Sequence, residues 1–373
     1  MTKIDFVYFD AGGGHRAAAT ALKTVIEGQG RPWQVRMVHL QELLDPLDVF
    51  RKATGIRLQD IYNRMLAKGW TLGAGQGLKV VHALIRMYHK PGVALLKQHW
   101  MLTQPDMVVS LVPNFNHALH QSLKGTLPHV PFGTILTDFA DHPPHFWIVP
   151  QEQFLICGTH KAVEQAKAMG HRDDNVFEVS GMVLRPKFYE PIAVERRAER
   201  LRLGLDPDRP TGLVLFGGHG SRKMLDIARQ LSDTQLILIC GRNQKLEAEL
   251  RRLPGKAPRL VEGFTTEIPY YMHLADFFIG KPGPGSISEA IAMRLPVTVE
   301  RNAATLPQER YNADWVEEHH AGIVLESFGK ITPAVKRMVR DLDSFKCRVA
   351  KIENRAVFEI PEILAGMLRK KQA

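Results

Sequence analysis

Residues 3–22, KIDFVYFDAGGGHRAAATAL, place three glycines and a histidine where an apolar run ends and an alanine-rich run begins. The apolar run at 4–9 predicts a buried β-strand, and the alanine-rich run predicts a helix. Glycines at such a junction let a ligand approach the backbone at the helix N-terminus. Apolar runs followed by helix-like segments recur along the chain and predict an α/β fold of parallel sheets covered by helices. The predicted strands are 4–9, 35–38, 107–111, 133–137, 154–156, 213–216, 236–240, 277–279 and 297–299.

The length of the chain predicts two domains. Its 373 residues exceed what one hydrophobic core usually organises. Residues 182–208 are rich in proline and charge and separate two series of predicted strands, so we expect domains at 1–181 and 182–343. The second series has its own strand that runs into glycines, LFGGHGSRK at 215–223. Two such units facing each other would form a cleft at the carboxyl ends of both sheets, where open α/β folds bind ligands.

Composition limits the location and the partners of the protein. Apolar residues make up 45% and charged residues 24%, as in ordinary globular proteins. We expect neither secretion nor a membrane span, because the sequence begins without a leader pattern and has no apolar run near ~18 residues. The three distant cysteines are typical of reduced thiols in a cytosolic protein.

The net charge of +10 is concentrated in one segment, because residues 51–100 hold nine Lys or Arg against a single acid, Asp60. Such a block favours an anionic partner. Within it, the helical spacing of apolar residues at 70–88 is typical either of an interfacial helix on anionic lipid or of a helix packed on its own core. No nucleic-acid-binding motif accompanies the charge, so nucleic acid is disfavoured. The expected membrane surface comprises Trp70, Lys79, Arg86 and Lys90.

The two glycine motifs suit an anion but not the common nucleotide cofactors. GGGHRA at 12–17 fits the loose dinucleotide fingerprint, yet His39 rather than an acid follows the second strand, which disfavours a nicotinamide enzyme. LFGGHGSRK lacks the spacing of a phosphate loop, which disfavours ATP or GTP hydrolysis. His15 has a suitable intrinsic pKa for a general base, and the alternative is a tight turn with a solvated histidine.

Residues 280–300, GKPGPGSISEAIAMRLPVTVE, are the most informative stretch. A strand leads through KPGPG into a helix, for which Ser286 or Ser288 is the expected cap. Amides after Gly283 and Gly285 would point at a phosphate, favoured by the helix dipole. Glu289 would accept a pair of sugar hydroxyls, so the stretch predicts phosphate beside ribose. The alternative is an ordinary acid near a helix N-terminus.

A metal site is disfavoured, because the sequence contains neither H-E-x-x-H nor C-x-x-C. The stretch TDFADHPPHFW at 137–147 carries two aspartates and two histidines, interrupted by two prolines. We interpret it as a loop that lines the cleft, with a metal cluster as the alternative.

Seven motifs together resemble a known family of enzymes. They are DAGGGHRAAA, TDFADHPPHFW, VSGMVLRPKF, LFGGHGSR, CGRN, VEGFTTEIPYYMHLADFFIGKPGPGSISEAIAMRLPV and LPQERYNADWV, in this order from residue 1 to about 325. The combination resembles the monogalactosyldiacylglycerol synthase and processive diacylglycerol glucosyltransferase family. It is more distantly similar to the N-acetylglucosaminyltransferase that completes the lipid-linked peptidoglycan precursor.

The resemblance implies a GT-B fold, in which two Rossmann-like doubly wound domains face each other across a cleft. It implies transfer of a hexosyl group from a UDP-sugar to a lipid hydroxyl such as that of diacylglycerol, with inversion and without metal or cofactor. The N-terminal domain, with its glycines Gly12, Gly13 and Gly14, would take the acceptor. His15 is the first candidate for the base and Asp138 the second. A last helix, at about 344–373, is expected to return to this domain.

By the same resemblance, the C-terminal domain would bind the donor. The backbone around Phe264 and Thr265 would contact the uracil, and Glu289 the ribose. The diphosphate would lie at Gly217, Gly218, Gly283, Gly285 and Ser286, with Arg185 nearby. Gln308 and Glu309 would contact sugar hydroxyls. Pro307 stands where the family usually has glycine, and His219 replaces a small residue.

Together these features predict a cytoplasmic enzyme held peripherally on the inner face of the cell membrane. Two alternatives remain, a UDP-sugar 2-epimerase of the same fold and a non-catalytic nucleotide-sugar-binding protein. The sequence fixes neither the sugar, the lipid, processivity nor the oligomeric state.

Overall fold

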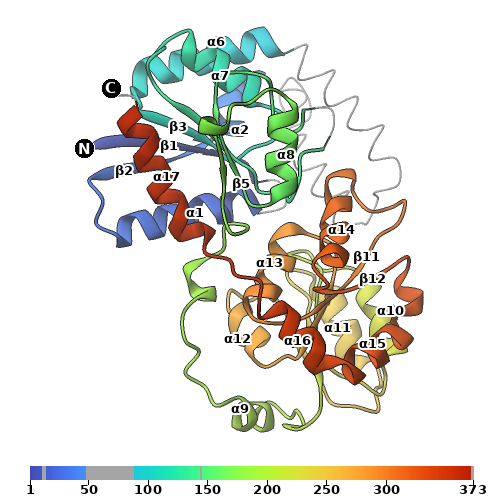
Figure 1. Ribbon diagram of the computed structural model, residues 1–373. Helices are drawn as coiled ribbons and strands as arrows, with labels where there is room; N and C mark the ends of the chain where they lie inside the picture. Colours follow the sequence, from blue (N-terminus) through green and yellow to red (C-terminus); the bar gives the residue numbers. More distant parts are fainter. Residues whose placement is uncertain (11–13, 48–87, 143–144, 371–373) are drawn as a thin grey trace. The chain divides into compact units, whose positions relative to one another are not determined.

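The computed structural model describes residues 1–10, 14–47, 88–142 and 145–370. These residues form two compact units (Figure 1). The first contains the described residues up to Pro186 together with those from Asn354 onward, and the second is Lys187–Glu353. Across the described ranges, no helix combines the length and the apolar character needed to cross a membrane.

The first unit is built on a six-stranded parallel sheet of order β2-β1-β3-β4-β5-β6. Its strands are β1 (Thr2–Tyr8), β2 (Trp33–His39), β3 (Met107–Ser110), β4 (Phe132–Ile135), β5 (Phe154–Cys157) and β6 (Val176–Glu178). Its helices are α1 (Gly14–Gly28), α2 (Leu40–Leu44), η1 (Asp45–Leu47), α6 (His89–Thr103), α7 (Asn116–Lys124), α8 (His160–Ala168), η2 (Asp173–Asn175) and α17 (Ala356–Lys370). The order of the strands reverses between β1 and β3, where Val7 pairs with Ser110. Open sheets bind ligands beyond the carboxyl ends of strands at such a switch point.

The second unit repeats this plan with the order β12-β11-β10-β7-β8-β9, again parallel throughout. Its strands are β7 (Thr211–Leu215), β8 (Gln235–Ile239), β9 (Arg259–Glu262), β10 (Phe277–Gly280), β11 (Val297–Glu300) and β12 (Gly322–Leu325). Its helices are α9 (Arg196–Arg202), α10 (Lys223–Gln230), α11 (Gln244–Arg252), α12 (Ile268–His273), α13 (Pro284–Ala292), η4 (Pro307–Glu309), α14 (Arg310–Glu318), η5 (Phe328–Lys330), α15 (Ile331–Arg340) and α16 (Leu342–Val349). A short helix, η3 (Pro186–Phe188), lies at the boundary between the units. The switch point lies between β7 and β10, where Leu215 pairs with Gly280.

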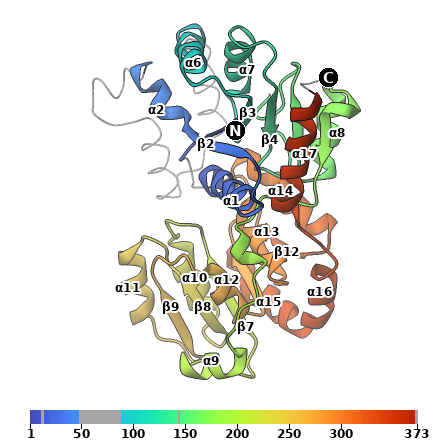
Figure 2. The same cartoon turned by 90° about the vertical axis from the view of Figure 1, so that its left-hand side faces the viewer.

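The stretch expected to form one helix from about residue 344 forms two. Helix α16 belongs to the second unit, and α17 lies beside α1 in the first (Figures 1 and 2). Asn354 separates them, because its Oδ1 accepts a hydrogen bond from the Ala356 amide at 3.2 Å while its Nδ2 donates to the Met182 carbonyl at 2.9 Å. The carboxylate of Glu359 then accepts hydrogen bonds from the amide and hydroxyl of Ser180 at 2.8 and 2.7 Å.

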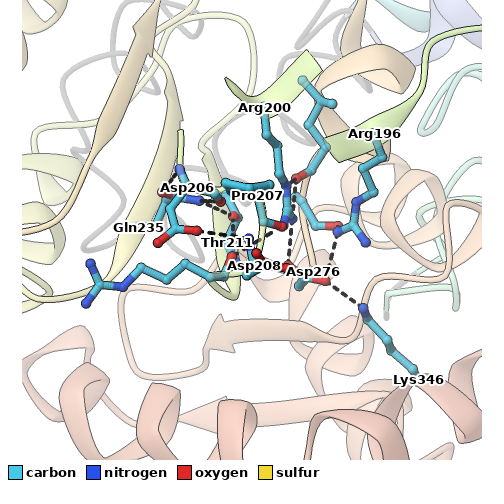
Figure 3. A network of polar contacts seen from close by, with 12 residues as sticks. Arg196, Arg200, Asp206, Pro207, Asp208, Thr211, Gln235, Asp276 and Lys346 are labelled. Atoms are coloured by element: carbon cyan, nitrogen blue, oxygen red, sulfur yellow. Dashed lines mark hydrogen bonds and ion pairs between the residues drawn. The ribbon is translucent and has the colours of Figure 1, made fainter. Parts of the chain in front are cut away.

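A buried polar network holds the amino ends of β7 and β10 in the second unit (Figure 3). Asp276, which precedes β10, accepts hydrogen bonds from Arg196, Arg200 and Lys346 at 2.7–2.8 Å. Its carboxylate also accepts from the Thr211 amide at 3.0 Å. Arg200 is 3% exposed, and its guanidinium also donates to the carbonyls of Leu274, Pro207 and Arg209. The network therefore joins α9, β7, β10 and α16 at the amino ends of these strands, opposite the switch-point loops.

Candidate functional site

His15 lies at the switch point of the first unit. It is the second residue of α1, half-buried just beyond the carboxyl end of β1. Its Nδ1 is 3.0 Å from the hydroxyl oxygen of Thr137, which follows β4, so the two side chains are hydrogen-bonded. Burial lowers the pKa of His15 to about 4, although a backbone hydrogen bond with Leu111 acts in the opposite direction. The imidazole is therefore neutral at pH 7 and can accept a proton.

Trp147 organises the loop beside His15. Its ring centroid is 5.8 Å from that of His15, and its Nε1 donates to Asp138 at 2.8 Å. Its backbone amide donates to Asp141 at 2.6 Å, and its carbonyl accepts from the amide group of Asn116 at 2.8 Å. Trp147 thus contacts both His15 and the second candidate base, Asp138, which is 8% exposed.

Asp141 shows how strongly this loop excludes water. Burial raises the pKa of its carboxyl to about 6, even though the backbone amides of Trp147, Ile148 and His142 favour the charged form. Within the described part of the chain, no three His, Cys, Asp or Glu side chains gather in a way that would hold a metal ion. Asp138 and Asp141 instead bind protein donors.

The structure also places three other predicted site residues of the first unit. Gly14 is the exposed first residue of α1, and Lys90 is exposed near the start of α6. Arg185 is half-buried just before the unit boundary and so belongs to the first unit. Five predicted site residues lie outside the described residues: Gly12, Gly13, Trp70, Lys79 and Arg86.

In the second unit, the loops after β7 and β8 pack backbone against backbone. Gly217, Gly220 and Gly241 have φ values of 73°, 61° and 59°, a region that favours glycine. A Cβ atom on Gly241 would lie 2.4 Å from the Gly218 carbonyl oxygen, which accepts a hydrogen bond from the Arg242 amide at 2.9 Å. A Cβ atom on Gly218, by contrast, would meet nothing within 4 Å. The packing therefore fixes the loop while one face of Gly218 stays open.

Helix α13 begins earlier than the sequence predicted. Its N-cap is Gly283, with φ −74° and ψ 135°, and neither Ser286 nor Ser288 caps it. The reason is Pro284, whose fixed φ suits the first helical position. Gly285 is exposed, and its amide is among the first N–H groups, which have no partner within the helix. Glu289 is half-buried on the second turn of the helix.

An ion pair lies beside this helix start. Nζ of Lys281, the residue after β10, is 2.9 Å from Oε1 of Glu309 in η4. Glu309 is 8% exposed, and Gln308 beside it is half-buried. From the sequence, Glu309 was expected to contact sugar hydroxyls, and no motif singled out Lys281 as a site residue. The available signal was a lysine placed directly between a strand end and Pro-Gly.

The predicted uracil contacts lie in the loop after β9. Phe264 is 56% exposed, with the guanidinium of Arg242 4.6 Å from its ring centroid. The Thr265 hydroxyl accepts a hydrogen bond from the Glu267 amide at 2.9 Å, which shapes the turn into α12. An exposed aromatic ring beside a guanidinium is suited to contact with a flat base.

Two α/β units, each with a six-stranded parallel sheet whose strand order reverses at a switch point, make up a GT-B-like fold. The solved structure of MurG from Acinetobacter baumannii has this fold, with a TM-score of 0.65 at 10% identity over 98% of this chain and 99% of that one. The UDP-GlcNAc 2-epimerase of Neisseria meningitidis, solved bound to UDP-GlcNAc, has a TM-score of 0.55 at 14% identity over 99% of this chain and 100% of that one.

Comparison of the sequence is more specific than comparison of the fold. Residues 15–183 match the model of monogalactosyldiacylglycerol (MGDG) synthase, and residues 213–363 match the glycosyltransferase family 28 C-terminal domain. The chain is 29% identical to monogalactosyldiacylglycerol synthase 1, chloroplastic, of Arabidopsis thaliana, over 100% of this chain and 72% of the relative. The chain thus matches the MGDG synthase family in its first part and a glycosyltransferase family 28 domain in its second part.

Proposed function

We propose that the protein transfers a hexosyl group from a UDP-sugar to the hydroxyl of a lipid such as diacylglycerol, with inversion and without a metal. The observation that carries the proposal is that residues 15–183 match the MGDG synthase model while residues 213–363 match the C-terminal domain of glycosyltransferase family 28. His15 and the loops around α13 supply chemistry that suits this reaction.

The proposed reaction exchanges one bond at the anomeric carbon. The acceptor oxygen forms a bond to this carbon while the bond to the β-phosphate oxygen breaks, and the electron pair leaves with UDP. The hydroxyl proton passes to His15 Nε2, and Nδ1–H donates to Thr137 in the tautomer that this step needs. A base with a pKa near 4 is weak but fully deprotonated at neutral pH. Asp138 is the second candidate for this role.

The donor is proposed to bind the second unit. The first amides of α13 and the glycine loop after β7 would stabilise the charge that develops on UDP. Glu289 would accept the ribose hydroxyls, and Gln308 with Glu309 the hydroxyls of the sugar. The remaining proposed donor contacts are Gly217, Gly218, Phe264, Thr265, Gly283, Gly285, Ser286 and, from the first unit, Arg185.

We also propose a cytoplasmic location, on the inner face of the cell membrane. The support is the basic excess of residues 51–100, because anionic lipid attracts such segments by about 1 kcal/mol per Lys or Arg. Peripheral binding would bring the first unit to a lipid acceptor.

The test is UDP release from a panel of UDP-sugars, with and without anionic vesicles that contain diacylglycerol. We expect release from one donor that depends on the lipid, and His15→Ala should bind UDP normally yet lose most turnover. Lipid-independent conversion of the sugar would indicate an epimerase. UDP binding without turnover of any donor would indicate a protein that only senses nucleotide sugars.

A further inference from the structure

We propose that Lys281 is the cation that neutralises the diphosphate of the donor, and that Glu309 holds Lys281 in place until the donor binds. This inference rests on the proposed function, because it concerns the proposed donor site of the second unit. It adds a residue that sequence reasoning did not assign. It also gives Glu309 two successive partners, first Lys281 and then the sugar.

The position of Lys281 supports the first part. It follows Gly280, which pairs with Leu215 at the switch point, so it stands between the glycine loop after β7 and the start of α13. A Cβ atom on Gly217 would lie 3.9 Å from Cε of Lys281, and one on Gly283 would lie 3.3 Å from it. Both loops that are proposed to hold phosphate therefore approach the same lysine stem.

The ion pair has unequal partners, and this supports the second part. The side chain of Lys281 is 41% exposed, whereas that of Glu309 is 11% exposed. An exposed lysine can turn toward a ligand at little cost, but a nearly buried carboxylate that loses its partner is strongly disfavoured. Release of Lys281 therefore costs less free energy when new hydrogen-bond donors reach Glu309.

A sugar attached to the diphosphate would supply those donors through its hydroxyls. UDP-sugar would then replace the partner of Glu309, whereas UDP alone would leave Glu309 uncompensated. The consequence is an opposite effect of the two residues on UDP affinity. Removal of Lys281 loses a charge-assisted contact, while neutralisation of Glu309 removes the competitor for Lys281.

The experiment is calorimetric titration of UDP, and of the accepted UDP-sugar, into the full chain and four variants. Lys281→Met should weaken UDP binding about 10-fold or more, since hydrogen bonds to charged groups contribute about 1.5–3 kcal/mol. Lys281→Arg should restore most of this loss. Glu309→Gln should tighten UDP binding several-fold yet reduce the preference for UDP-sugar over UDP. Lys330→Met breaks an exposed pair with Glu326 in the same unit and should change neither affinity.

A purely structural ion pair would behave differently, because Lys281→Met and Glu309→Gln would then weaken UDP binding alike and lower the unfolding temperature alike. That result, or unchanged UDP affinity in Lys281→Met, would overturn the inference. Failure of the proposed function looks different again. The wild type would bind UDP and release it from no donor, while the opposite shifts in UDP affinity would persist. A wild type that fails to bind UDP would overturn both.

Discussion

The surroundings of His15 have opposing effects on its ability to act as a base. Burial keeps the imidazole neutral, so it is ready to accept a proton, but the same burial makes it a weaker base. Thr137 offsets part of this weakness if it fixes which ring nitrogen carries the proton. The ring of Trp147 limits the remaining freedom of the imidazole. A histidine in this environment has its orientation fixed before the acceptor arrives.

Replacement of Thr137 tests this role. Thr137→Val keeps the shape but removes the hydrogen bond to Nδ1, and we expect kcat to fall about 5- to 10-fold, as the loss of ~1 kcal/mol predicts. KM for the donor should not change, because the donor is proposed to bind the other unit. Steady-state rates measure both. Thr137→Ser keeps the hydroxyl and should retain most of kcat, whereas equal losses in the two variants would point to packing alone.

At the level of elements, the glycines in the loops after β7 and β8 serve either backbone packing or the proposed binding of UDP. Single variants should change one of these without the other. Gly241→Ala should lower the free energy of unfolding by about 1–3 kcal/mol or more, because it strains a positive φ and forces a Cβ against the Gly218 carbonyl. Gly218→Ala meets open space, so it should keep stability but weaken UDP binding. Denaturant unfolding and UDP titration of both variants measure the two effects. A stable Gly241→Ala would contradict the backbone packing described for these loops.

The sequence predicted the central strands well and missed three of the four edge strands. Every predicted strand is present, but β6, β9 and β12 were not predicted. All three lie at the edge of a sheet, and their residues are mostly half-buried, whereas those of the central strands are mostly buried. An edge strand is covered less completely, so its sequence carries a weaker apolar signal.

Residues of the candidate site could be predicted only where the signal lies within a short stretch of sequence. Motifs singled out His15, Asp138 and the glycine-rich stretches as candidates, since those signals are contiguous in sequence. The pairing of Lys281 with Glu309 joins residues 28 positions apart, and no local pattern specifies it. The bond from Thr137 to His15 spans 122 positions. Such partners are set by the order of strands in the sheet.

For the molecule as a whole, titratable groups in the two units contribute differently to the dependence of stability on pH. In the first unit, His15 has a lowered pKa and costs stability as the pH falls from 6.5 to about 4. Asp141 has a raised pKa and adds stability as the pH falls from 6 toward 3.8, so the two contributions largely cancel. In the second unit, burial alone would raise the pKa of Asp276, but Lys346, Arg196 and Arg200 together hold it well below its usual range.

Asp276 is therefore expected to control acid unfolding of the second unit. The stability that it contributes is complete above its unfolded pKa of about 3.8 and is lost as the pH falls below that value. Asp276→Asn should cost about 3–5 kcal/mol at pH 7, because it leaves the buried guanidinium of Arg200 without its charged partner, and should remove most of this acid dependence. Denaturant titrations at pH 7 and pH 3 measure both effects. Asp208→Asn, which alters an exposed pair with Arg197, is the control.

The return of α17 to the first unit affects the order in which the protein can fold during synthesis. Residues 187–353 are contiguous, so the second unit can fold as soon as it leaves the ribosome. The first unit begins earlier but lacks the helix that lies beside α1 until residues 356–370 have been made. The part of the chain that carries His15 is thus started first and completed last. The surface of α1 that packs beside α17 therefore stays uncovered while the second unit is translated.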